Sequence, residues 1–77
     1  MNDRQLLQRY AANASDEAFG QLVERHVNLV YSAALRLVNG DAHLAQDVAQ
    51  LVFTNLARKA AALPPDVILA GWLHRDT

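Results

Sequence analysis

The sequence predicts an all-α fold, a small bundle of three to four helices within one domain of 77 residues. Two observations support this prediction. Apolar side chains recur at helical spacing along most of the chain, and the residues that break helices fall at only three places. These places are residues 15–16, 39–41 and 63–66. They divide the chain into four helical segments.

The first two helices are defined by their apolar faces and their ends. The first is expected from about Asp3 to Asn13. The second is expected to begin at Ser15, whose hydroxyl can cap it, and to end at Asn39-Gly40. Its apolar face covers about half of the circumference, more than the ~100° stripe of an ordinary surface helix, so we expect two or more packing neighbours. That face comprises Phe19, Leu22, Val23, His26, Val27, Val30, Tyr31, Ala34, Leu37 and Val38.

The third helix is expected from its N-cap, Asp41, to about Ala62. Its buried face comprises Ala45, Val48, Ala49, Val52, Leu56 and Ala60. The stripe expected to face solvent comprises His43, Asp47, Gln50, Thr54 and Arg58. Leu44 and Leu51 flank Asp47 on the solvent side. Two exposed leucines beside one carboxylate are typical of a partner surface, although an extra packing neighbour would also explain them.

The fourth helix is expected from its cap, Asp66, to Thr77. Ile68, Leu69, Trp72 and Leu73 fall on one face. Trp72 fits a core anchor, and a base-stacking platform is the alternative. Since no C-cap, Gly or Pro ends this helix, we expect the chain to continue in a longer protein. The core is expected to gather Phe19, Val27, Val30, Val48, Val52, Leu56 and Trp72, with His26 close by.

Composition excludes several classes of function. Seven Lys and Arg against eight Asp and Glu give a formal charge of −1, which does not suit a protein that holds duplex DNA by itself. Without cysteine there is no disulfide and no thiolate metal site. No apolar run approaches the roughly 18 residues of a membrane span, and residues 1–5 begin no signal peptide. We therefore expect a cytoplasmic protein without membrane contact.

No group of residues predicts catalysis. His26 lies in the apolar face of the second helix, where a hydrogen-bonded core histidine is the ordinary interpretation. His43 and Asp47 are four residues apart, but two ligands are too few for a stable zinc site. The three glycines are isolated, so there is no phosphate-binding loop. The sequence predicts a binding domain that is not an enzyme and needs no cofactor or metal ion.

Three stretches resemble one known family. Residues 40–53 (GDAHLAQDVAQLVF) resemble region 2.2 of bacterial RNA polymerase sigma factors. Residues 16–19 (DEAF), followed by Leu22 and Tyr31, resemble the preceding helix in the extracytoplasmic-function class. Residues 71–75 (GWLHR) are similar to the start of region 2.4. The resemblance spans about residues 3–77 and implies a sigma region 2 domain, cut within the helix that reads the promoter −10 element.

The resemblance also implies partners and contact residues. The domain would bind the clamp helices of the β′ subunit of core RNA polymerase and help to melt promoter DNA at −10, holding mainly the non-template single strand. An anti-sigma factor is a further candidate partner. The polymerase-binding residues would be Leu44, Asp47, Gln50, Leu51, Thr54 and Arg58. The DNA-binding residues would be Leu63, Asp66, Ile68, Trp72 and Arg75.

Departures from the family pattern leave a second interpretation open. Leu51 stands where glutamate is usual, the loop at 63–68 lacks the usual Phe and Arg, and Asp76 stands where an apolar residue is common. The alternative is a helical protein–protein interaction module, an adaptor or regulator-binding domain that uses the same Leu44 and Leu51 patch.

Overall fold

The computed structural model describes residues 2–64 and 68–76, and within these ranges every regular element is a helix. The elements are α1 (Asp3–Asn13), α2 (Asp16–Leu37), α3 (Ala42–Lys59), the single 3-10 turn η1 (Ala60–Ala62) and α4 (Leu69–Asp76). The prediction of a small all-α bundle is therefore confirmed.

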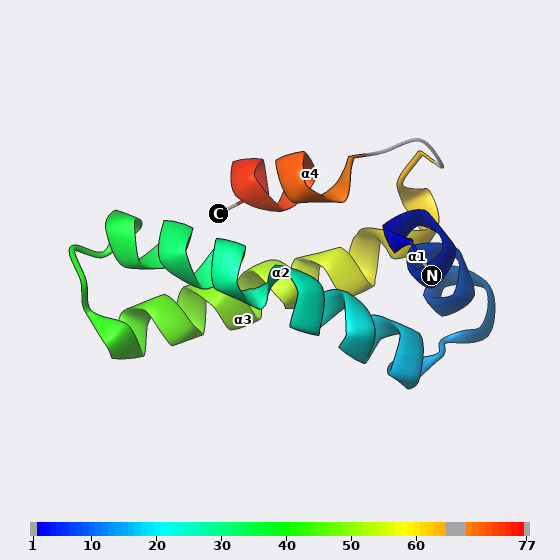
Figure 1. Ribbon diagram of the computed structural model, residues 1–77, viewed down its shortest axis with the longest axis horizontal. Coiled ribbons are helices and arrows are strands. Elements are labelled where there is room, and N and C mark those ends of the chain that lie inside the picture. The colour runs from blue at the N-terminus through cyan, green and yellow to red at the C-terminus, as the bar shows by residue number, and fades with distance from the viewer. Residues whose placement is uncertain (1, 65–67, 77) are drawn as a thin grey trace.

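The two long helices form the frame of the molecule. α2 and α3 run antiparallel and are joined by a tight turn at residues 38–41, along a molecule whose longest dimension is 37 Å (Figure 1). α1 packs against α2 and η1 at the end opposite that turn, whereas α4 lies against α2 and α3. α2 thus contacts the other three α-helices, as its wide apolar face predicted.

Polar side chains fix where the helices begin. The Gln5 backbone N–H donates to the Asn2 side chain at 2.8 Å, and the Asn2 N–H donates to the Gln5 side chain at 3.1 Å. The predicted caps Ser15 and Asp41 are both confirmed, since each side chain accepts the N–H three residues further on, at 3.2 and 3.1 Å. Between α2 and α3, Gly40 has a φ of 82°, a conformation that favours glycine.

One apolar cluster joins all the helices. Its buried members are Leu6, Leu7, Ala18, Leu22, Val30, Ala49, Val52, Phe53, Leu56, Ala60, Leu69 and Leu73. Phe19, Val48 and Trp72 pack against the cluster while half-buried. The core-anchor interpretation of Trp72 is consistent with this position.

Val27 and Leu37, which belong to the apolar face expected to be buried on α2, lie at the surface, and so does Ile68, which the sequence placed on the apolar face of the fourth helix and among the DNA contacts. Val27 is 38% exposed, Leu37 is 62% exposed and Ile68, just before α4, is 77% exposed. A helical wheel assigns one buried face to a whole helix, but α2 changes neighbours along its length. α2 is contacted by α3, by α1 and by α4. Its buried side therefore changes along the helix, and Val27 and Leu37 are left uncovered.

The ends of the last two helices also differ from expectation. α3 ends at Lys59, and the turn up to Ala62 is a 3-10 helix that buries Ala60. Phe53 is buried although it was not assigned to the core. The expected cap of the fourth helix, Asp66, lies outside the described residues, and α4 is described from Leu69.

Candidate functional site

One face of α3 forms a continuous exposed surface, here called the α3 stripe. Ala45, Ala49 and Val52 turn the opposite face of the helix into the core. The α3 stripe lies on the opposite side of the helix from these buried residues, and so it faces solvent. It consists of Leu44, Asp47, Gln50, Leu51, Thr54 and Arg58, all of them exposed. All six residues that the sequence assigned to a polymerase contact thus share one surface.

The chemistry of the α3 stripe is that of a small apolar patch around one charge. Leu44 is 51% exposed and Leu51 is 60% exposed, and both flank Asp47. Among the residues that the structure describes, no hydrogen bond or ion pair engages the Asp47 carboxylate. Thr54 is satisfied within the helix, because its hydroxyl donates to the Gln50 carbonyl at 2.8 Å. The stripe therefore offers two apolar groups and one unpaired carboxylate to a partner.

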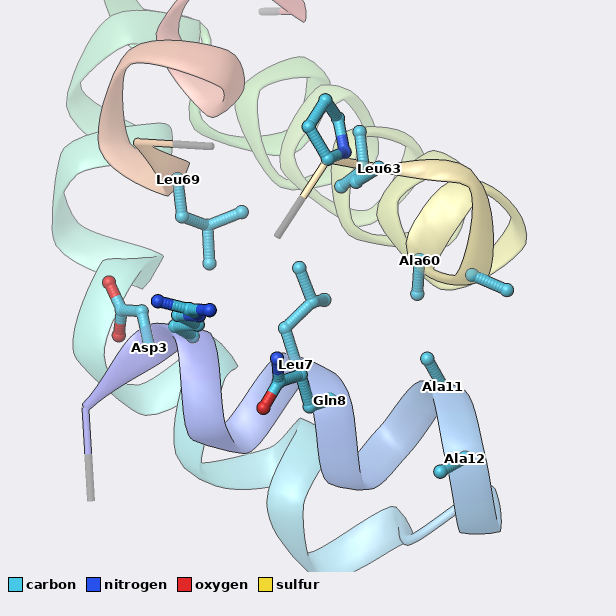
Figure 2. A pocket seen from close by; sticks show the side chains of 11 residues that line it. Asp3, Leu7, Gln8, Ala11, Ala12, Ala60, Leu63 and Leu69 are labelled. Atoms are coloured by element: carbon cyan, nitrogen blue, oxygen red, sulfur yellow. The ribbon is translucent and has the colours of Figure 1, made fainter. Parts of the chain in front are cut away.

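A pocket of about 390 Å³ lies at the end of the molecule where α1 meets η1 and the start of α4. We call it the α1 pocket. Figure 2 shows Leu7 on α1 and Leu69 on α4 extending into the same space, with Leu63 and Ala60 across from α1. The walls are apolar, and its volume lies within the range of small-ligand sites, about 300–1,000 Å³.

Polar side chains from the first turns of α1 line one side of the α1 pocket: Asp3, Arg4 and Gln8. The Asp3 carboxylate is engaged from α2. It accepts from Arg25 Nη1 at 3.2 Å and lies 2.7 Å from His26 Nε2. His26 is half-buried with this partner, which agrees with the interpretation of a hydrogen-bonded histidine.

The structure describes four of the five residues assigned to DNA contact, and only Leu63 lines the α1 pocket. Leu63 is half-buried in the wall of the α1 pocket, and Asp66 lies outside the described residues. Ile68 is exposed, Trp72 packs against the core and Arg75 is exposed on α4. None of these last three lines the α1 pocket.

Sequence reasoning missed the contribution of α1 to this pocket. Arg4, Gln8 and Ala11 recur at helical spacing on α1 and line the pocket together. That spacing is visible in the sequence, but nothing in the sequence shows that this face of α1 lies opposite η1. The pairing is a tertiary contact.

Other kinds of site are not seen in the described part of the chain. Within residues 2–64 and 68–76, no three His, Cys, Asp or Glu side chains gather as a metal site would require. None of the helices described there has the length and apolar character needed to cross a membrane.

Comparison with known proteins gives one match. The family model described as Sigma-70 region 2 matches residues 22–75, which is more than half of the chain. The matched range takes in most of α2 and all of α3 and η1, and it leaves α1 outside. No curated protein and no solved structure matches the chain.

Proposed function

Because the chain belongs to the Sigma-70 region 2 family, and therefore has a sigma-factor role in transcription initiation, we propose that it binds core RNA polymerase through the α3 stripe and helps to melt the promoter −10 element. The polymerase site is the clamp helices of the β′ subunit. The domain works in the cytoplasm, it is of the extracytoplasmic-function class, and catalysis remains with the polymerase.

The α3 stripe is the observation that supports this proposal most directly. It lies within the matched range, it is exposed over its whole length, and its apolar and acidic groups are not used by the rest of the fold. A few central residues normally carry most of the free energy of a protein–protein contact. Leu44, Asp47 and Leu51 are the central residues here.

The DNA part of the proposal rests on α4 and the segment before it. Arg75 is an exposed cation for a phosphate, and half-buried Trp72 has part of its indole accessible to a base. Leu63, Asp66 and Ile68 belong to the stretch between η1 and α4 and would contact the displaced non-template strand. Stacking and a few cations suit single strands better than duplex DNA.

A titration of a fluorescently labelled chain with a β′ clamp-helix fragment tests the docking. We expect Asp47→Ala and Leu51→Arg each to weaken binding by more than about fivefold, the effect of losing a central contact of about 1 kcal/mol. Leu37→Arg is the matched control, because Leu37 is as exposed as Leu51 but lies on α2. The control should bind like wild type.

Two results would count against the proposal. Equal affinity of wild type and both α3 variants would move the polymerase contact to another surface. Absence of binding to both the fragment and core polymerase, with helicity intact, would favour the alternative of an adaptor or regulator-binding module. Regulation by an anti-sigma factor stays a separate prediction, tested by competition with the clamp-helix fragment.

A further inference from the structure

The walls of the α1 pocket are aliphatic and suit a saturated hydrocarbon chain. Leu7 and Leu69 extend into the same space opposite Leu63 (Figure 2), and alanines of α1 and η1 complete the lining. No aromatic side chain of the described residues lines the pocket, so a flat ring would find no stacking partner there. The volume of about 390 Å³ lies near the lower end of the range of small-ligand sites, about 300–1,000 Å³. A chain of medium length fits such a space.

The rim of the α1 pocket carries one positive charge that the fold does not compensate. Asp3 and Arg4 are the charged residues among those that line it. The Asp3 carboxylate is engaged from α2, where it accepts from Arg25 Nη1 at 3.2 Å and lies 2.7 Å from His26 Nε2. Within the part of the chain that the structure describes, no hydrogen bond or ion pair engages the exposed Arg4 guanidinium. The rim therefore has an available cation, although the whole chain has a net charge of −1.

Gln8 and the start of α1 add to this preference for an anion. Gln8 lies four residues after Arg4, so both side chains belong to one face of α1, and both line the α1 pocket. A guanidinium donates two parallel hydrogen bonds to a carboxylate, and a side-chain amide donates another. Arg4 also lies in the first turn of α1, the end at which a helix dipole is positive.

We propose that the α1 pocket binds a small amphipathic carboxylate, a saturated chain of medium length that lies against the leucines and whose carboxylate accepts from Arg4 and Gln8. The inference goes beyond the proposed function and does not rest on it, because the α3 stripe has no part in the argument. α1 lies outside the range that the family model matches, so the family match assigns no role to Arg4 or Gln8.

An aliphatic side chain of a protein partner is the main competing occupant of the α1 pocket. It would fit the walls, but it would use neither the guanidinium nor the amide at the rim. A bare phosphate would use the rim and would lose its hydration against the apolar walls. A ligand with an apolar chain and an anionic end uses walls and rim together, and this combination favours the carboxylate.

Methyl NMR on the 77-residue chain tests the proposal with four probes: octanoate, butanoate, 1-octanol and octylammonium. We expect octanoate to shift the methyl signals of Leu7, Leu63 and Leu69. Each buried methylene raises affinity by about fourfold, so octanoate should bind at least about tenfold more tightly than the shorter butanoate. Octylammonium, which has the same chain length and the opposite charge, should bind more weakly than octanoate.

The same titrations define the results that contradict the proposal. Unchanged pocket leucines at millimolar octanoate would overturn it, and so would equal affinity for octylammonium. Leu37 and Arg36 line another hollow, on α2, and octanoate shifts confined to Leu37 would place the ligand there instead. Pocket leucines that shift with a leucine-rich peptide but not with octanoate would assign the α1 pocket to a protein side chain.

Variants at the rim separate the charge contact from packing. Arg4→Gln should weaken octanoate binding by about threefold or more, the effect of losing an exposed charge contact, and should leave the affinity for uncharged 1-octanol unchanged. Arg36→Gln makes the same change of charge at an exposed position that does not line the α1 pocket, and it should bind octanoate like wild type. Equal losses in both variants would show a bulk charge effect. Equal losses of octanoate and 1-octanol in Arg4→Gln would show a packing effect, and either result refutes the carboxylate assignment.

A blocking variant tests the walls. Ala11→Phe places a ring at the edge of the α1 pocket and should abolish the octanoate shifts, whereas Ala42→Phe, at an exposed position that does not line the pocket, should not. Octanoate shifts that persist in Ala11→Phe, with helicity intact, would contradict binding inside the pocket. Because polymerase is absent from these samples, the result is independent of the clamp-helix titration, and either proposal can fail alone.

Discussion

The burial of Val52 provides a sharp test of the core. Its side chain is 3% exposed and lies on the face of α3 that belongs to the central cluster. Val52→Ala removes two methyl groups, which at about 0.8 kcal/mol each amounts to ~1.6 kcal/mol, and an unfilled cavity raises the loss to about 2–3 kcal/mol. A chain of 77 residues has a free energy of unfolding of only about 4–12 kcal/mol.

Thermal and urea unfolding followed by circular dichroism measure this loss. For a domain of this size the melting temperature should fall by at least about 6 °C. Val27→Ala is the matched control, since it deletes the same two methyl groups at a position that is 38% exposed. We expect that change to cost about 0.5 kcal/mol or less. Equal losses at Val52 and Val27, or a larger loss at Val27, would refute the packing of α2 against α3.

Three further predictions follow from local geometry and charge. Gly40→Ala should lower the free energy of unfolding by about 1 kcal/mol, because a φ of 82° is strained for alanine. In the same urea titration, Gly20→Ala inside α2 should raise the free energy of unfolding by about 0.5–1 kcal/mol, because alanine loses less backbone entropy in a helix and its Cβ meets open space. Ser15→Ala should cost about 1 kcal/mol through the lost cap of α2, and no change in the urea midpoint would contradict that role. The Kd of the chain for duplex DNA, measured by fluorescence anisotropy at physiological salt, should be weaker than micromolar. A chain with a net charge of −1 neutralises few phosphates and so displaces few counterions from the DNA. A micromolar or tighter Kd would contradict this.

The sequence predicted those parts of the fold that depend on short stretches of chain. The caps Ser15 and Asp41 were predictable because each side chain bonds to a backbone N–H only three residues away. Val27 and Leu37 were assigned wrongly for the opposite reason. Their exposure depends on where α1 and α4 lie along α2, and a helical wheel contains no information about neighbours.

The same distinction applies to the candidate sites. The exposure of the α3 stripe was predictable because all of its residues lie on one helix, and Leu51 stood out as an apolar residue on a polar face. The α1 pocket was not predictable, since it joins residues near position 8 with residues near position 60. Only the contact between α1 and η1 brings Gln8 and Leu63 to one cavity.

α1 has one face packed in the core and one face lining the α1 pocket, with Leu7 shared between them, and this decides how its function can be tested. Leu6, fully buried, and Tyr10, whose ring centroid lies 4.7 Å from that of Phe19, hold the helix against α2. The other face lines the α1 pocket with Arg4 and Gln8. Deleting α1 would remove core packing and the pocket wall together, so any loss of function in such a deletion would have two explanations. Substitutions at exposed Arg4 and Gln8 leave the core face intact, so they test the pocket face of this helix separately from its folding.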